Sequence, residues 1–215
     1  MTTIDTVVFD IGNVLISWDP RWLFRQLLED DAAIAHFFSE VDFFAWNEQH
    51  DAGQLFAQGI ADHSARFPHH AHLFQAFFDR WEETLGPAIE GNVRLARRLR
   101  STGYRTLALT NFSTETFPHA LRRHAFLTEF EGILVSGREQ LLKPDPAIYR
   151  LLCARHQVTP ARAVFIDDSL KNVEGARQIG MHAIHFQSVE QLSADLRQLG
   201  VRVDAPLARP DAGTP

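Results

Sequence analysis

Two apolar stretches of the chain end in acidic residues. Residues 7–9 lead into Asp10, and residues 163–166 lead into Asp167 and Asp168. Each is the pattern of a buried parallel strand that delivers a carboxylate to the edge of a sheet. Capping of a turn by Asp10 would account for one such strand, but two of them predict a cluster of carboxylates at one edge. A cluster of this kind holds a hard cation or shares protons.

The second half of the chain alternates between strand and helix patterns. Strand patterns cover residues 105–109, 132–136, 163–166 and 182–186, and helical patterns cover residues 91–101, 115–123, 147–156, 170–179 and 189–199. The alternation predicts right-handed crossovers and a parallel sheet that is covered by helices on both faces. We therefore expect a doubly wound α/β core.

The segment between the first strand and about residue 86 lacks a strand pattern. Helical patterns rich in aromatic residues cover residues 21–29, 32–44 and 71–85, and Gly53, Gly59 and Pro68 separate them. We interpret this segment as an all-helical insert. The expected boundaries are a core of residues 1–16 and 87–203, a helical domain of residues 17–86, and a flexible tail of residues 204–215 that is rich in Pro, Ala, Asp and Gly.

The aromatic residues of the insert recur at helical spacing, which is typical of buried helix faces. We expect most of them to pack in a core, and the candidates for lining a ligand pocket are Trp18, Phe43, Phe44 and Trp46. The histidines at positions 63, 69, 70 and 72 lie close together without a cysteine or carboxylate partner nearby in sequence. No metal site is therefore assigned to them.

Length, charge and cysteine content narrow the class of protein. A chain of 215 residues with 45% hydrophobic and 22% charged residues is large enough to bury a full core. A formal net charge of −6 argues against nucleic-acid binding, although small phosphorylated ligands remain compatible with it. The single cysteine, Cys153, excludes internal disulfides. Without a signal-peptide pattern or an apolar span, the expected protein is soluble and cytoplasmic, with no membrane partner.

Ligands of doubly wound sheets bind beyond the carboxyl ends of the strands, near the point where the strand order reverses. We therefore expect the residues that follow the strands to converge there: Asp10, Gly12, Thr110, Asn111, Lys143, Asp167 and Asp168. Magnesium would relieve the mutual repulsion of the carboxylates. Asp10 would then attack phosphorus and form a phosphoaspartate, while Thr110, Asn111 and Lys143 would hold the phosphoryl oxygens.

Four segments in the order of the chain resemble the motifs of the haloacid dehalogenase superfamily. They are residues 9–14, residues 109–111, residues 143–149, and residues 165–169 together with Asn172 and residues 175–176. The pattern is most similar to that of sugar-phosphate phosphatases. The resemblance implies a Rossmann-like core with a helical cap inserted after the first strand.

The same resemblance implies roles for individual residues. Asp10 would be the nucleophile, Thr110 a phosphate-binding hydroxyl with Asn111 beside it, and Lys143 the stabilising cation. Asp10, Asp168 and the main-chain carbonyl of Gly12 would bind Mg²⁺, and Asp167 would contribute directly or through water.

Gly12 departs from the pattern of most phosphatases of this superfamily, which carry a second aspartate two residues after the nucleophile. That aspartate protonates the leaving group and later activates water. Three explanations stay open. The protein is a phosphatase that acts on a good leaving group or takes an acid from the cap, or it is a dehalogenase, whose halide product needs no proton, or it is catalytically inactive.

The dehalogenases resemble one another in an early arginine of the cap and in small polar residues in place of the last acid pair. This chain has no arginine between Arg25 and Arg66, and it retains Asp167 and Asp168. Both facts favour a magnesium-dependent phosphatase that hydrolyses a small phosphomonoester, such as a sugar phosphate, through phospho-Asp10. A metal-independent 2-haloacid dehalogenase and a noncatalytic protein that binds a phosphorylated ligand are the alternatives.

Overall fold

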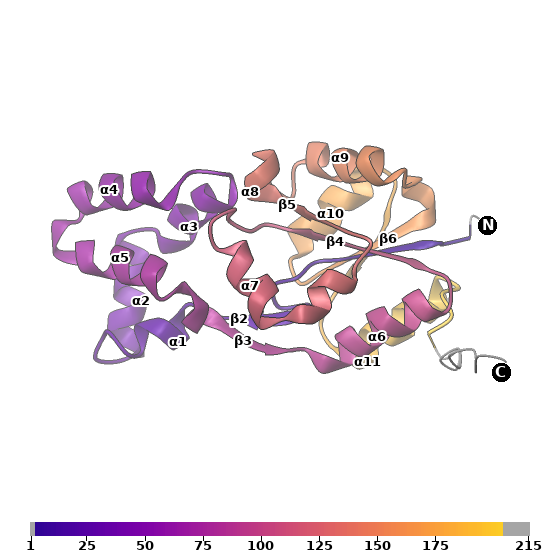
Figure 1. Ribbon diagram of the computed structural model, residues 1–215, viewed down its shortest axis with the longest axis horizontal. Coiled ribbons are helices and arrows are strands. Elements are labelled where there is room, and N and C mark those ends of the chain that lie inside the picture. Colours follow the sequence, from indigo (N-terminus) through magenta and orange to yellow (C-terminus); the bar gives the residue numbers. More distant parts are fainter. Residues whose placement is uncertain (1–2, 204–215) are drawn as a thin grey trace, which may run out of the picture.

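A computed structural model describes residues 3–203 and contains a central parallel sheet of five strands (Figure 1). The strand order is β5-β4-β1-β6-β7, and every adjacent pair is parallel. The strands are β1 (Thr6–Phe9), β4 (Arg105–Thr110), β5 (Gly132–Val135), β6 (Ala163–Asp167) and β7 (His182–His185). The predicted doubly wound sheet is thus confirmed, and its strand order reverses at β1. The expected tail of residues 204–215 lies outside the described residues.

Helices cover both faces of this sheet. Figure 1 shows α9 (Pro146–His156) and α10 (Leu170–Gln178) on one face, and α6 (Glu90–Ser101) and α11 (Val189–Gln198) on the other. The side chains of β1 alternate between two apolar clusters, with Val7 and Phe9 in one and Val8 in the other. Because both faces are buried, β1 is apolar without a break rather than at alternate positions.

Local sequence signals determine several helix ends. The carboxylate of Asp145 accepts a hydrogen bond from the Ala147 N–H at the start of α9, where Pro146 occupies the first helical position. Helix α6 ends at Ser101, and Gly103 follows with a φ of +91°. This left-handed conformation favours glycine, and the predicted end of the helix at residue 101 is confirmed. None of the helices within residues 3–203 has the length and apolar character needed to cross a membrane.

The segment after β1 forms a group of helices beside the carboxyl ends of the strands (Figure 1). Its helices are α1 (Arg21–Phe24), α2 (Asp31–Glu40), α3 (Phe43–Asp51), α4 (Phe56–Arg66) and α5 (Ala71–Asp79). We call residues 21–79 the helical layer. Aromatic side chains fill its interior, as the helical spacing predicts, and the largest fully buried ones are Phe24, Phe37, Phe43, Trp46, Phe56, Phe74 and Phe77.

The prediction that residues 17–86 are all helical is wrong at both ends. Strands β2 (Ile16–Trp18) and β3 (Leu85–Ala88) pair in antiparallel fashion where the chain leaves and re-enters the core. Strands of three and four residues are too short to show an alternating pattern, and β3 also contains Gly86 and Pro87. Their pairing depends on the return of the chain, which a local pattern does not contain.

The predicted helix of residues 32–44 is two helices, because Asp42 between α2 and α3 adopts a left-handed conformation with φ +48°. Gly53 does interrupt the helical pattern, with φ +103° after the end of α3. Gly59, expected as another break, lies inside α4.

Gly59 allows α3 and α4 to approach closely. A Cβ atom at this position would lie 2.2 Å from the Cε1 atom of His50, a fully buried residue of α3. The ring of His50 stacks on Phe56, and the Nε1 atom of Trp46 donates a hydrogen bond to the Gly59 carbonyl over 3.3 Å. Glycine is therefore required at this crossing by packing rather than by a turn.

We predict that Gly59→Ala lowers the free energy of unfolding by about 1–3 kcal/mol, because the new methyl group overpacks the contact with His50. In an open helix the same change raises stability by about 0.5–1 kcal/mol. Urea unfolding measures the effect, with Gln58→Ala on the exposed side of α4 as the control. An increase in stability for Gly59→Ala would show that the crossing is loose.

Candidate active site

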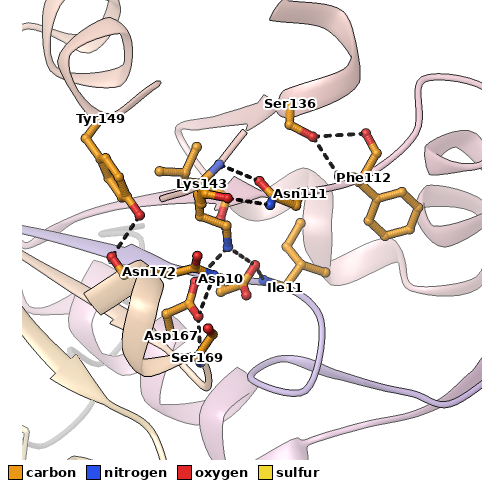
Figure 2. Close-up of polar contacts among 11 residues, drawn as sticks. Asp10, Ile11, Asn111, Phe112, Ser136, Lys143, Tyr149, Asp167, Ser169 and Asn172 are labelled. Carbon is orange, nitrogen blue, oxygen red and sulfur yellow. Dashed lines mark hydrogen bonds and ion pairs between the residues drawn. The ribbon is translucent and has the colours of Figure 1, made fainter. Parts of the chain in front are cut away.

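Asp10 lies at the point where the strand order reverses. It follows β1 directly, and its N–H donates a hydrogen bond to the Ile166 carbonyl of β6 over 2.8 Å. The N–H of Ile11 donates to the Asp10 Oδ1 atom over 2.7 Å, which orients the carboxylate (Figure 2). Asp10 keeps 7% of its surface exposed, so its carboxylate is buried but not sealed.

A tight turn follows Asp10. The N–H groups of Leu15 and Ile16 both donate to the Ile11 carbonyl, and Asn13 adopts a left-handed conformation with φ +53°. Asparagine tolerates this conformation better than most residues do. A Cβ atom built on Gly12 would meet nothing within 4 Å. Crowding is therefore not the reason that position 12 lacks a side chain.

Lys143 joins the ends of three strands. Its ammonium group lies 2.8 Å from the Oδ1 atom of Asp10 and 2.7 Å from the Oδ2 atom of Asp167, and it donates to the Leu109 carbonyl over 3.2 Å (Figure 2). Burial of the side chain opposes its charge. The attraction and hydrogen bonds of the two carboxylates outweigh this effect, so the pKa of Lys143 lies above its usual value.

Three carboxylates, those of Asp10, Asp167 and Asp168, have oxygen atoms within 4.8 Å of one another. Burial raises the pKa of Asp10 well above its usual value against the attraction of Lys143, and the charge of Asp167 raises it further. Burial and then Asp167 also raise the pKa of Asp168. Lys143 is the one cation that the described contacts give this cluster, so negative charge is in excess. An all-oxygen cluster with excess negative charge fits a hard divalent cation.

The carboxylate of Asp167 accepts hydrogen bonds from three residues. Besides Lys143, it accepts hydrogen bonds from the Ser169 N–H over 2.8 Å and from the Asn172 side chain over 3.0 and 3.2 Å (Figure 2). The hydroxyl of Tyr149 donates to the Asn172 carbonyl over 2.8 Å. Asp168, in contrast, is exposed as a residue, although its carboxyl group is partly buried and accepts a hydrogen bond from the Asn13 side chain. The two adjacent acids therefore differ, because Asp167 is fully buried and Asp168 reaches solvent.

Thr110 and Asn111 follow from β4, as predicted. Thr110 is the last residue of the strand and is buried beside the site. The side chain of Asn111 accepts from the Lys143 N–H over 2.8 Å and donates to the Lys143 carbonyl over 3.0 Å (Figure 2). The Asn111 amide thus holds the backbone that carries the lysine, a role that the sequence did not indicate.

A pocket opens over these groups, and both the sheet and the helical layer line it. The residues are Asp10, Ile11, Gly12, Ile16, Trp18, Asn47, Asp51, Trp81, Leu85, Thr110, Asn111, Phe112, Lys143 and Asn172. The structure thereby brings together the predicted Asp10, Gly12, Thr110, Asn111 and Lys143, with Asp167 and Asp168 adjacent to Asp10.

Only one of the four aromatic residues predicted as candidates for a ligand pocket lines the pocket over Asp10. Trp18 lines the pocket, but Phe43 and Trp46 are buried inside the helical layer and Phe44 lies in a separate groove beside Trp18. Trp81, which the sequence did not single out, also lines the pocket. Helical periodicity marks a buried residue in the same way whether it faces a core or a cavity, so it could not separate these cases.

Two of the four clustered histidines have a carboxylate partner that the sequence did not reveal. The Nε2 atoms of His69 and His70 each lie 3.0 Å from an oxygen of Glu40. Glu40 ends α2, about thirty residues earlier in the chain, so proximity in sequence did not indicate this contact.

A family profile described as haloacid dehalogenase-like hydrolase matches residues 4–180. A sesquiterpene phosphatase of Aspergillus oryzae is 25% identical over 92% of this chain and 97% of its own length.

Solved structures of similar fold include a haloacid dehalogenase family enzyme of Bacteroides thetaiotaomicron, with a TM-score of 0.70, 20% identity, and coverage of 91% of this chain and 99% of that one. The same enzyme has been solved with magnesium and inorganic phosphate. An L-2-haloacid dehalogenase of Xanthobacter autotrophicus has a TM-score of 0.60, 16% identity, and coverage of 95% of this chain and 86% of that one. At these identities the structures establish the fold alone.

We predict that Lys143→Met destabilises the protein by about 3–5 kcal/mol, because the change leaves buried carboxylates without their cation. Lys171 is the only other lysine of the chain and serves as a matched control. Its ammonium is exposed and lies 3.8 Å from Glu48, so Lys171→Met should alter stability by less than about 0.5 kcal/mol. Urea unfolding in metal-free buffer compares the two variants, and equal effects would show that the Lys143 ion pairs are dispensable.

Proposed function

The chain belongs to the haloacid dehalogenase-like hydrolases, and on this premise we propose that it is a magnesium-dependent phosphatase of a small phosphorylated metabolite, such as a sugar phosphate. The observation that carries the proposal is the cluster of Asp10, Asp167 and Asp168, in which Lys143 pairs with the first two, beside a pocket that Asp10 and Lys143 line. A nucleophilic carboxylate, a fixed ammonium and an oxygen-only metal site are the groups that phosphoryl transfer through an aspartate requires.

Asp10 is the proposed nucleophile. One of its oxygens attacks phosphorus, the bond from phosphorus to the leaving oxygen breaks, and a phosphoaspartate forms. The ammonium of Lys143 and the hydroxyl of Thr110 hold the phosphoryl oxygens as negative charge develops on them. Asn111 fixes the backbone of Lys143 through its two hydrogen bonds, so that the ammonium does not need to reorganise during the reaction.

The residues present fit Mg²⁺, because the donors are oxygen atoms and their charge exceeds that of Lys143. Asp10, Asp168 and the main-chain carbonyl of Gly12 would bind the ion, which when bound offsets the charge on the phosphoryl group. The carboxylate of Asp167 already accepts hydrogen bonds from the Lys143 ammonium, the Ser169 N–H and the Asn172 side chain. We therefore assign it a position at the ion through water, with Asp168 as the direct ligand.

The helical layer and its two linking strands, within residues 17–86, are the proposed cap over this site, and residues 3–16 and 87–203 form the core. Support comes from the pocket, which Asn47 and Asp51 of α3 line together with residues of the sheet. We place the protein in the cytoplasm, in keeping with a single, buried cysteine.

A dehalogenase is the less favoured reading. The carboxylate pair Asp167–Asp168 is retained, and no arginine occurs between Arg25 and Arg66, in the segment that forms α2, α3 and most of α4. A halogenated acid would therefore meet excess negative charge near Asp10 and no arginine from this segment to bind its carboxylate.

We predict phosphate release from a panel of sugar phosphates in the presence of Mg²⁺, and its loss in chelator and in Asp10→Asn. The amide of the variant cannot form the phosphoaspartate, so activity should fall below about 10⁻³ of the wild type, the range seen when a catalytic nucleophile is removed. Colorimetric detection of phosphate measures the reaction. Full activity in chelator or in Asp10→Asn would overturn the proposal.

Three further measurements identify the alternatives. Halide release from 2-haloacids without metal would identify a dehalogenase. If the protein shows neither activity, formation of a stable complex of Asp10 with beryllium fluoride and Mg²⁺ would show that the nucleophile is competent. The substrate would then lie outside the panel of sugar phosphates. Failure to form that complex, together with phosphate binding, would identify a noncatalytic binding protein.

We also predict that Asp168→Asn raises the Mg²⁺ concentration for half-maximal activity at least about tenfold, since the variant loses a charged ligand of the ion. Maximal activity at saturating Mg²⁺ should fall less, because Asp10, Lys143 and Thr110 are unchanged. Asp62→Asn, at an exposed position of α4, is the control. An unchanged Mg²⁺ dependence in Asp168→Asn would remove Asp168 from the metal site.

A further inference from the structure

The proposed reaction lacks one group in the immediate surroundings of Asp10. A sugar or alkyl leaving group needs a proton as its bond to phosphorus breaks, and the water that attacks the phosphoaspartate must lose one. Gly12 has no side chain to do either. The space at this position is open, since a Cβ atom there would meet nothing within 4 Å. The acid must therefore come from another part of the pocket.

Asp51 is the one candidate among the residues that line the pocket. Of those residues, only Asp10 and Asp51 carry a carboxyl group, and none is a histidine, cysteine, tyrosine or glutamate. Asp51 is the last residue of α3, in the helical layer, whereas Asp10 follows β1 of the sheet. The two residues therefore line the pocket from different parts of the structure.

Contacts with both parts hold Asp51 in place. Its carbonyl accepts a hydrogen bond from the Ser136 hydroxyl over 2.6 Å, which ties the end of α3 to the residue that follows β5. Its carboxyl group accepts from the Asn47 side chain over 3.2 Å and from the backbone of Ser113, in the segment after β4. A side chain held at both its backbone and its tip meets the positional demand on a proton donor.

The surroundings of Asp51 favour its protonated form. Burial raises the pKa of this carboxyl group to about 8, and the negative charge of Glu48 on the same helix acts in the same direction. The hydrogen bond from Ser113 and the charge of Lys143 oppose the rise without cancelling it. Lys171 faces Glu48 at 3.8 Å and weakens its influence. A carboxyl group with this pKa carries a proton at neutral pH and can give it up.

Resting on the proposed phosphatase function, we propose that Asp51 is the catalytic acid and base that replaces the side chain missing at Gly12. As the bond from phosphorus to the leaving oxygen breaks, that oxygen takes the proton of Asp51 and departs as an alcohol. The resulting Asp51 carboxylate then takes a proton from the water that attacks phosphorus. The bond to Asp10 breaks, phosphate leaves, and both aspartates return to their starting states.

The experiment compares two substrates that differ in their need for an acid. Alkyl phosphates such as sugar phosphates require protonation of the leaving oxygen, whereas p-nitrophenyl phosphate releases a stable anion. For Asp51→Asn, kcat/KM should fall about 10²–10⁴-fold on the sugar phosphate and less than about tenfold on p-nitrophenyl phosphate. Because kcat/KM covers only the steps up to release of the alcohol, slow hydrolysis of phospho-Asp10 does not affect this comparison.

Asp51→Asn also removes the proposed base for the attacking water, which should be visible in the time course of the reaction. Asp51→Asn should release p-nitrophenol in a burst that approaches the enzyme concentration, followed by a slow phase, as phospho-Asp10 accumulates. For the wild type, kcat/KM on the sugar phosphate should fall as the pH rises through about 8, since the acid must be protonated. Glu48→Gln should move this fall in kcat/KM to lower pH, because the variant removes a negative charge that raises the pKa of Asp51. Asp51→Asn should not show the fall.

A rescue variant separates chemistry from folding. In Gly12→Asp/Asp51→Asn the new carboxyl group enters open space two residues after the nucleophile, and kcat/KM on the sugar phosphate should recover at least about tenfold over Asp51→Asn. Asp62→Asn, an exposed residue of α4 whose carboxylate accepts from Gln58, is the control for removal of an acid from the helical layer.

The possible outcomes are distinct. An equal loss of kcat/KM on both substrates, with no burst and no rescue, would show that Asp51 only positions α3 and would overturn the inference. The phosphatase function would then stand if the wild type is active and Asp10→Asn is not. An inactive wild type would overturn the phosphatase function itself.

Discussion

The ammonium of Lys143 is the interaction on which the rest of the site depends. It is shared by Asp10 after β1, Asp167 at the end of β6 and the Leu109 carbonyl of β4, so one buried charge ties three adjacent strands together. The attraction within a buried ion pair offsets the free-energy cost of desolvating its charges only when the remaining hydrogen-bonding groups also have partners. Here Asn111 holds the lysine backbone, and Ser169 and Asn172 hold Asp167. The same network that makes the buried charge tolerable also aims Asp10 at the pocket.

Much of this arrangement was predictable, because it follows from rules that act locally. Uninterrupted apolar runs indicate strands that are buried on both faces, and helices between them force the strands to be parallel. Parallel strands end at the same edge, so the residues after β1, β4 and β6 had to meet. Asp10, Thr110 and Asp167 required no further information. Lys143 also lies at the edge where its loop was expected, although its direct contacts with Asp10 and Asp167 became visible only in the structure.

Features that depend on contacts distant in sequence were not predictable. Strands β2 and β3 form only because the chain returns to the core, and Glu40 meets His69 and His70 only because α2 packs beside the turn before α5. Gly59 looked like a helix break because the ring of His50 that requires it comes from another helix. Asp51 had no motif around it. Its significance arises from the pocket that it enters and from the burial that raises its pKa, and both are properties of the assembled fold.

The proposed division of the acid and the nucleophile between two parts of the fold has a physical consequence. An acid two residues after the nucleophile moves with it, so its distance to the leaving oxygen is a property of one turn. Asp51 instead reaches the site from α3, and its distance to Asp10 depends on how the helical layer sits on the sheet. Two contacts fix the position of the helical layer relative to the sheet. They are the hydrogen bond from Ser136 to Asp51 and the close approach of Gly53 to the Gly137 carbonyl. Any opening of the layer would withdraw the acid and admit water to its carboxyl group. That exposure would lower its pKa and remove its proton, so this geometry would confine proton transfer to the closed pocket.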